Sequence, residues 1–268
     1  MYQFLRQSSC LKQSDSATHK EMKFGLIGHP IEHSLSPALF KAGYDGSYPY
    51  ELIETPDFEQ AYARFLGEYD GINVTAPFKE LALRKADIIS DECRMIGATN
   101  LLVKTSEGIK AYNSDYLGVK LWLSEISKGR DRLPKVLIVG MGGAGKAAAA
   151  AAKSSGYETV LINRTQYSPE IQPLNDFCNE FRKADIIIYN LPVRIPQIDM
   201  LSEEDLSAGN GKTILEANYR HPEFHLEHEN IRYVDGREWL LLQAVTGYEI
   251  FTGKTPDYDA MKAVIKSK

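Results

Sequence analysis

The chain has 268 residues, a formal net charge of −5, and a hydrophobic fraction of 43%. This length can hold one large domain or two modest ones, and the acidic balance gives no support to a nucleic-acid partner or an anionic membrane surface. No apolar run approaches the roughly 18 residues of a membrane span, and three widely spaced cysteines exclude a disulfide framework. These features predict a cytoplasmic protein with no membrane partner.

The first 21 residues differ from the rest of the chain. They form a polar run without helical or strand periodicity, and they lack the apolar core of a signal peptide. A second methionine, Met22, stands directly before a strand-like run at 23–28. We expect residues 1–21 to be a disordered extension, with a short ordered arm as the alternative.

From Met22 onwards, short β-like runs alternate with helical ones. The predicted strands of the first half are 23–28, 50–54, 71–74 and a hairpin of 98–104 with 108–112. A helix near 115–127 and the basic link 128–134 lead to predicted strands at 135–139, 159–163, 185–190, 213–216 and 231–234. Helices are predicted at 239–252 and 257–266. This spacing is typical of βαβ units, so we expect an α/β fold with mostly parallel sheets.

Two serines follow the first strand. Ser34 and Ser36 stand directly before Pro37, which predicts a helix with Ser36 as its N-cap and Pro37 as its first residue. Two hydroxyls at a helix N-terminus can bind a carboxylate. Capping alone is the alternative function of this pair.

The strand at 71–74 ends in a group of polar residues. Asn73 and Thr75 are followed by Pro77 and by Lys79 on the next helix. Ligands of open α/β sheets bind at the carboxyl ends of strands, so this cluster can contact a substrate. Taken alone, Lys79 is better interpreted as a surface lysine of the helix. Asp115 either begins a helix or faces Lys79 as the second member of an acid–base pair.

The strongest local signal is a glycine-rich loop between a strand and a helix. Gly140, Gly142 and Gly145 match G-x-G-x-x-G after the apolar run 136–139 and before an alanine-rich helix that ends near Gly156. Such glycines allow a tight turn, close approach to a pyrophosphate, and close packing of helix on strand. The loop predicts dinucleotide binding, with a purely structural turn as the alternative.

The residues after the next strand bear on which dinucleotide binds. NAD sites usually place an acidic residue there for the ribose 2′-hydroxyl, whereas this chain has Asn163, Arg164 and Thr165. A guanidinium suits a 2′-phosphate, so NADP is favoured over NAD. Arg164 as a solvated surface charge is the alternative.

Three histidines have a spacing that can bind a metal on a helix. His221, His225 and His228 fall at i, i+4 and i+7, but Pro222 interrupts the stretch, which is strongly polar. We expect a solvated surface helix here and no metal site.

Taken together, the motifs resemble those of the shikimate dehydrogenase family from Met22 to the end of the chain. In order they are S-L-S-P, N-V-T-x-P-x-K, G-A-x-N, N-S-D-x-x-G, the glycine loop, N-R-T and a late glutamine. The resemblance implies NADPH-dependent reduction of 3-dehydroshikimate to shikimate in aromatic amino acid biosynthesis. It also implies a substrate domain of residues 22–114 with 239–268, and a Rossmann-type NADP domain of residues 115–238.

The resemblance also implies residue roles. Lys79 and Asp115 match the catalytic pair. The residues implied to bind substrate, with the two serines on its carboxylate, are Ser34, Ser36, Asn73, Thr75, Asn100, Tyr219 and Gln243. The residues implied to bind the cofactor are Gly140, Met141, Gly142, Gly143, Ala144, Asn163, Arg164, Thr165, Gly236 and Asp91. No metal is implied, and the chain is expected to be a monomer or homodimer.

Several positions depart from the family pattern. They are Leu101, Leu191, Glu216, Trp239 and Ser168, and all but the first lie on the cofactor half. Two alternatives therefore stay open beside the implied activity. One is a quinate/shikimate dehydrogenase that uses NAD, and the other is a non-catalytic sensor that binds ligand and nucleotide without turnover.

Overall fold

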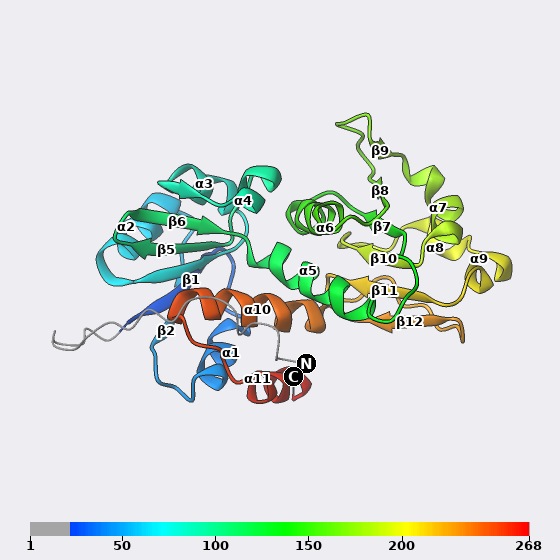
Figure 1. Ribbon diagram of the computed structural model, residues 1–268. Coiled ribbons are helices and arrows are strands. Elements are labelled where there is room, and N and C mark those ends of the chain that lie inside the picture. Colours follow the sequence, from blue (N-terminus) through cyan, green and yellow to red (C-terminus); the bar gives the residue numbers. More distant parts are fainter. Residues whose placement is uncertain (1–21, 268) are drawn as a thin grey trace.

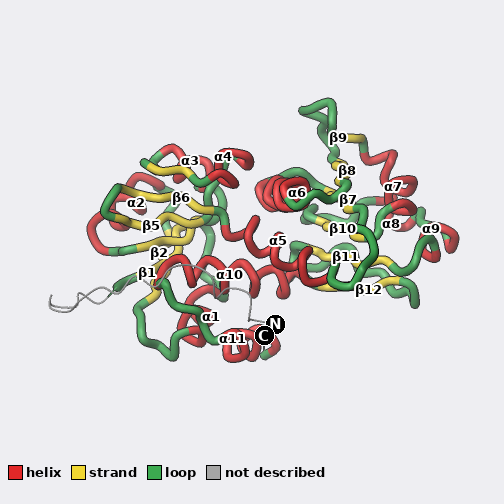
Figure 2. Tube along the Cα trace, viewed as in Figure 1, coloured by secondary structure: helices red, strands yellow, loops and turns green. Residues whose placement is uncertain are grey.

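The computed structural model describes residues 22–267, so the extension expected at 1–21 lies outside the described residues. Two α/β units stand side by side, and long helices occupy the space between them (Figure 1). Figure 2 shows the strands gathered into one sheet on each side of these helices. No helix in the described part of the chain is long and apolar enough to cross a membrane.

The first unit is built on a mixed sheet with the order β2-β1-β3-β5-β6-β4. Its strands are β1 (Phe24–Gly28), β2 (Tyr50–Glu54), β3 (Gly71–Val74), β4 (Ile88–Ile89), β5 (Leu101–Thr105) and β6 (Gly108–Tyr112). β1 runs parallel to β2 and β3, whereas β5 pairs antiparallel with β3 and with its hairpin partner β6. Its helices are α1 (Ser36–Gly43), α2 (Phe58–Glu68), α3 (Lys79–Arg84) and α4 (Asp91–Ile96).

The second unit is built on a fully parallel sheet with the order β12-β11-β10-β7-β8-β9. Its strands are β7 (Val136–Val139), β8 (Thr159–Ile162), β9 (Ile171–Gln172), β10 (Ile186–Tyr189), β11 (Lys212–Glu216) and β12 (Ile231–Val234). Its helices are α6 (Gly143–Ser154), the 3₁₀ turn Leu174–Asp176, α7 (Phe177–Lys183), α8 (Pro196–Asp199) and α9 (Glu203–Ser207). Counted within this sheet, the order is that of the doubly wound dinucleotide fold, and it reverses between β7 and β10.

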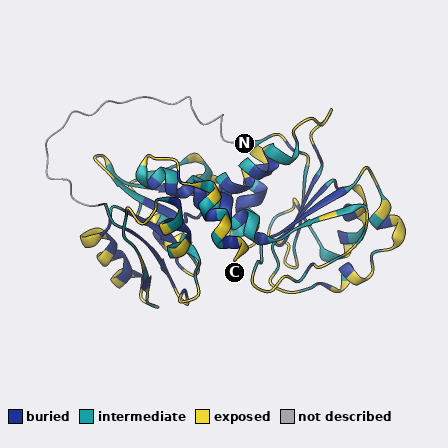
Figure 3. Cartoon of the chain, turned by 90° about the horizontal axis from the view of Figure 1, so that it is seen from below, coloured by how far each residue is buried: buried dark blue, intermediate teal, exposed yellow. Residues whose placement is uncertain are grey.

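Two long helices, α5 (Ser114–Ile126) and α10 (Gly236–Thr252), join the two units and pack against each other. α11 (Tyr258–Lys266) then returns to pack on α1. Figure 3 shows buried residues continuing from both sheets into these central helices. The close approach of α5 and α10 requires Gly118, because a Cβ there would lie 2.7 Å from the backbone nitrogen of Gln243.

The α/β class and every strand predicted from the sequence are confirmed, with the largest shift at the start of β5, from 98 to 101. The two-residue strands β4 and β9 were missed because two residues carry no recognisable periodicity. The expected domain boundaries at 114/115 and 238/239 stay a prediction.

Two local predictions are wrong. The N-cap of α1 is Leu35 and not Ser36, because the Leu35 carbonyl already accepts the first helical hydrogen bond, from the Leu39 amide. The histidine stretch is not a helix, since the buried Glu216 carboxylate accepts hydrogen bonds from the Glu223 and Phe224 amides and fixes an extended loop.

The packing at Gly118 gives a stability prediction. Gly118→Ala should lower the free energy of unfolding by about 1–3 kcal/mol, because the added methyl meets the backbone of α10 and not a movable side chain. Thermal and denaturant unfolding measure the change.

The matched control is Gly67→Ala in α2, where a Cβ has no neighbour within 4 Å. That variant should be stabilised by roughly 0.5–1 kcal/mol, as usual for a helical glycine. Equal behaviour of the two variants would contradict the proposed close contact.

Candidate active site

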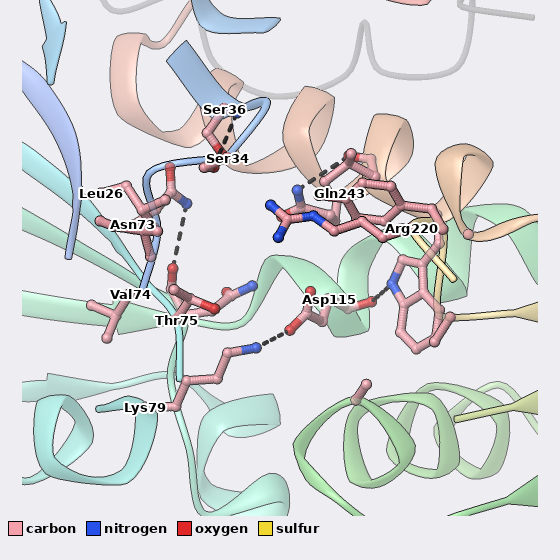
Figure 4. Close-up of a pocket in the computed structure, with 18 of the residues that line it drawn as sticks. Leu26, Ser34, Ser36, Asn73, Val74, Thr75, Lys79, Asp115, Arg220 and Gln243 are labelled. Carbon is pink, nitrogen blue, oxygen red and sulfur yellow. Dashed lines mark hydrogen bonds and ion pairs between the residues drawn. The ribbon is translucent and has the colours of Figure 1, made fainter. Parts of the chain in front are cut away.

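A cavity of about 400 Å³ opens between the two units, at the carboxyl ends of β1 and β3 (Figure 4). The first unit, α5 and α10 contribute most of its polar wall: Ser34, Ser36, Asn73, Thr75, Lys79, Asn100, Asp115 and Gln243. The loop after β11 contributes Ala217, Tyr219 and Arg220, and Ala144, Gly236, Trp239 and Leu240 complete the opposite side. The structure therefore brings together, around one cavity, all the residues that the family resemblance implies for substrate binding.

A lysine and a carboxylate form the central pair of the cavity. Lys79 is the first residue of α3 and Asp115 is the second residue of α5, and Lys79 Nζ lies 2.6 Å from Asp115 Oδ2. The two side chains are 24% and 17% exposed, so both are partly desolvated and still reachable from the cavity. Trp239 Nε1 donates to the Asp115 backbone carbonyl at 3.2 Å and fixes the start of α5. This geometry allows proton transfer to a ligand oxygen.

The two serines lie at the N-terminus of α1. The Ser36 amide donates to Ser34 Oγ at 3.2 Å, and the two hydroxyl oxygens are also 3.2 Å apart. Behind them, the Tyr248 hydroxyl of α10 donates to the Ser36 carbonyl at 3.1 Å. Burial raises the pKa of Tyr248 above its usual range, so this hydroxyl stays a donor. The serines therefore present neutral hydroxyls from a fixed backbone.

Sequence reasoning missed two polar residues that hold the site from behind. Tyr50 of β2 donates from its hydroxyl to Asn73 Oδ1 at 2.7 Å. Ser114 is completely buried: its hydroxyl donates to Gln243 Oε1 at 2.9 Å and accepts from Asn100 Nδ2 at 3.0 Å. The N-S-D run was a signal for Ser114, whereas nothing local to Tyr50 indicated its partner across the sheet.

The glycine loop has the geometry that dinucleotide binding needs. Gly140 has a φ of +89°, and a Cβ on Gly145 would lie 1.8 Å from the Gly140 carbonyl oxygen, so both positions require glycine. Neither Gly142 nor Gly143 has a neighbour within 4 Å of a Cβ, which leaves space for phosphates at the start of α6. The buried Asn190 Oδ1 beside this loop has no hydrogen-bond partner.

The residues after β8 support this loop. Asn163 Oδ1 accepts from the Met141 amide at 3.2 Å, and Asn163 Nδ2 donates to the Thr165 carbonyl at 2.9 Å. Arg164, between them, is exposed. Ala144 and Gly236 line the cavity itself, so the nucleotide side and the substrate side share one space. Asp91 is an exposed residue at the start of α4 and is not among the residues that line this cavity.

Most departures from the family pattern have a structural explanation. The Glu216 carboxylate is fully buried and also accepts from the Tyr233 hydroxyl, so it anchors the loop that carries Tyr219. Leu101 is buried in the core around α10. The Leu191 side chain packs against the Gly140 backbone. For Ser168 we find no structural explanation.

The three histidines lie in an extended loop and not on a helix. Within residues 22–267 no group of three or more His, Cys, Asp and Glu side chains is placed to hold a metal ion. His228 is mostly buried, with Nε2 3.0 Å from a Glu203 carboxylate oxygen.

Comparison with known proteins identifies the family. The model of the shikimate dehydrogenase substrate-binding domain matches residues 26–102. A shikimate dehydrogenase (NADP(+)) of Caldanaerobacter subterraneus subsp. tengcongensis is 30% identical over 272 residues, covering 91% of this chain and 96% of that protein. The chain belongs to the shikimate dehydrogenase family.

Solved structures agree with this membership. The family member from Thermus thermophilus, shikimate 5-dehydrogenase in complex with NADP(H) and shikimate, has a TM-score of 0.76 at 25% identity, covering 92% of this chain and 99% of that chain. A quinate dehydrogenase of Corynebacterium glutamicum in complex with NAD has a TM-score of 0.75 at 20% identity, with coverage of 92% and 99%. At that identity the second likeness shows the fold alone.

The buried Ser114 gives a second stability prediction. Ser114→Ala should lower the free energy of unfolding by about 1–3 kcal/mol, because Asn100 Nδ2 and Gln243 Oε1 each lose a partner. Ser106→Ala, at an exposed turn between β5 and β6, is the control and should change it by less than about 0.5 kcal/mol. Chemical denaturation measures both, and a change in Ser114→Ala as small as the control would refute the bridging role.

Proposed function

We propose that this protein catalyses the reversible, NADPH-dependent reduction of 3-dehydroshikimate to shikimate, a step of aromatic amino acid biosynthesis. One observation carries the proposal: the Lys79–Asp115 pair, 2.6 Å apart, lies in a cavity that Ala144 and Gly236 of the nucleotide side also line. An acid–base pair and a dinucleotide loop that face one space fit transfer of hydride to a ring ketone.

The substrate-side residues match the groups of a hydroxylated cyclohexene carboxylate. The hydroxyls of Ser34 and Ser36, at the N-terminus of α1, bind the carboxylate. The ring hydroxyls are bound by amide and hydroxyl groups of the protein. The residues that supply these groups are Asn73, Thr75, Asn100, Tyr219 and Gln243. Because Ser114 and Tyr50 already hold several of these side chains, they are preorganised before the substrate arrives.

The cofactor, when bound, supplies the hydride that goes to the ketone carbon. Lys79 donates a proton from Nζ to the ketone oxygen as negative charge develops there. Asp115 Oδ2 lies 2.6 Å from the Lys79 ammonium group and holds it in place. Asp115 also accepts a hydrogen bond from the hydroxyl that forms when the ketone oxygen is protonated. In the direction of oxidation, Lys79 takes the proton back. Packing of Trp239 against the start of α5 keeps Asp115 in position throughout.

The residues of the second unit fit NADP. The glycine loop would hold the pyrophosphate at the N-terminus of α6, where Gly142 and Gly143 leave open space. The exposed Arg164 would bind the 2′-phosphate beside Asn163 and Thr165, and no acidic residue stands at these positions to favour a ribose 2′-hydroxyl.

The activity is tested by following absorbance at 340 nm at alkaline pH, which removes the proton released on oxidation. Shikimate and quinate are each combined with NADP⁺ and NAD⁺. Turnover should occur with shikimate and NADP⁺, and Lys79→Ala should lower kcat by about 10²- to 10⁴-fold, as expected for loss of a general acid–base group. Lys85→Ala is the control, since Lys85 is an exposed residue at the end of α3 that pairs with Glu59.

The other outcomes identify the alternatives. Turnover mainly with quinate and NAD⁺ would contradict the proposed substrate and cofactor and would favour an NAD-dependent quinate/shikimate dehydrogenase. Shikimate binding by calorimetry without turnover in any combination would instead favour a non-catalytic sensor. Equal loss of activity in Lys79→Ala and Lys85→Ala would remove the proton-transfer role from Lys79.

A separate prediction concerns the cofactor. Arg164→Ala should raise KM for NADP⁺ by about 10- to 100-fold, because a charge-assisted hydrogen bond is worth about 1.5–3 kcal/mol. KM for NAD⁺, which lacks the 2′-phosphate, should hardly change and serves as the internal control. A similar increase for both nucleotides would mean that Arg164 does not recognise the phosphate.

A further inference from the structure

Arg220 reaches across the cavity from one unit to the other. It lies in the loop after β11, in the second unit, and its Nη2 donates to the backbone carbonyl of His33 at 2.8 Å. His33 directly precedes Ser34 in the loop after β1. In Figure 4 the guanidinium points into the space between the Ser34–Ser36 pair and Gln243.

Arg220 also supplies the unbalanced charge of the cavity. Its lining has three charged side chains, and two of them, Lys79 and Asp115, neutralise each other at 2.6 Å. None of the ion pairs among residues 22–267 includes Arg220. A guanidinium has five N–H donors, and the single protein acceptor shown for this side chain is the His33 carbonyl. The remaining donors are free for a ligand.

The loop that carries Arg220 is held firmly. The Arg220 amide donates to Asn218 Oδ1 at 3.3 Å, and Asn218 also caps the following turn through the His221 amide at 3.2 Å. The buried Glu216 carboxylate fixes the end of the loop at Glu223 and Phe224. The backbone that carries the arginine is therefore fixed, and the exposed Arg220 side chain extends from it to line the cavity.

We propose that Arg220 is a specificity-determining residue that binds the substrate carboxylate together with Ser34 and Ser36. The inference rests on the proposed function and adds the charged group of that site. Serine hydroxyls are neutral, and a carboxylate that leaves water needs an opposite charge or a charge-assisted donor to offset its desolvation. The net positive charge of the cavity, which Arg220 provides, thus selects cyclic carboxylates over uncharged ring alcohols and ketones.

The contact with His33 gives the same residue a second effect. The Arg220 guanidinium donates a hydrogen bond to the loop that carries Ser34. The guanidinium and the serine hydroxyls therefore lie on the same side of the cavity when the two units are close together. Binding of a carboxylate between them adds a link between the units. Substrate charge is thereby coupled to the approach of the substrate side to the nucleotide side.

The test compares shikimate with its uncharged methyl ester on the full chain. Calorimetry with Arg220→Ala should show shikimate binding weakened by about 10- to 100-fold, with binding of the methyl ester changed by less than about threefold. In the 340 nm assay KM for shikimate should rise by a similar factor while kcat stays within a few-fold, because the carboxylate is remote from the reacting carbon. Arg220→Lys should restore part of the affinity, since it keeps the charge and loses the planar fork.

Arg232→Ala is the matched control, because Arg232 is an exposed arginine on β12 outside the cavity. It should leave both ligands and both kinetic constants unchanged. Equal weakening of shikimate and its ester in Arg220→Ala would show a structural role and overturn the inference, as would unchanged or tighter shikimate binding. Absence of shikimate turnover in the wild-type protein would instead overturn the proposed function itself.

Discussion

The N-terminus of α5 is the point on which the rest of the site depends. Three consecutive residues there perform three different tasks: Asn113 caps the helix by accepting from the Tyr116 amide, Ser114 is buried between Asn100 and Gln243, and Asp115 pairs with Lys79. These contacts tie the first sheet, α10 and α3 to one helical turn. A shift of that turn would displace the Lys79–Asp115 pair together with the Asn100 and Gln243 amides, so these side chains depend on one another for their positions.

A second constraint comes from strand direction. The parallel strands β1 and β3 end at the cavity, and the glycine loop follows β7 next to the point where the second sheet reverses its order. Because chemistry in open α/β sheets gathers at the carboxyl ends of strands, the two units need only face each other across α5 and α10 to present both sets of residues to one space. The glycine contact at Gly118 keeps these two helices close enough for that arrangement.

The sequence was sufficient for those parts of the structure that local rules decide. Periodicity, turn chemistry and the motif pattern predict every strand except the two-residue β4 and β9, as well as the glycine loop and the polar ends of β1 and β3. Contacts between distant residues were not predictable in this way. The Tyr50 hydroxyl of β2 donates to Asn73 on β3, with β1 between the two strands, and Arg220 donates to the His33 carbonyl, 187 positions away in the sequence. The helix predicted around His225 does not form for the same reason. The buried Glu216 carboxylate of β11 binds the backbone amides of this segment and holds it as an extended loop, whatever its histidine spacing.

The departures from the family pattern bear on whether the site is built for turnover or for binding alone. Trp239 lines the cavity and donates to the backbone carbonyl of Asp115, so this replacement holds the backbone that carries the carboxylate. Glu216 and Leu101 do not contact the Lys79–Asp115 pair: the buried Glu216 carboxylate accepts from the Tyr233 hydroxyl, and Leu101 packs in the hydrophobic core. A partly buried lysine and carboxylate lose hydration, and a site that only recognised a ligand could replace both with neutral hydrogen-bonding groups at lower cost. Retention of this pair, beside a glycine loop with open space for phosphates, therefore favours an enzyme over a sensor.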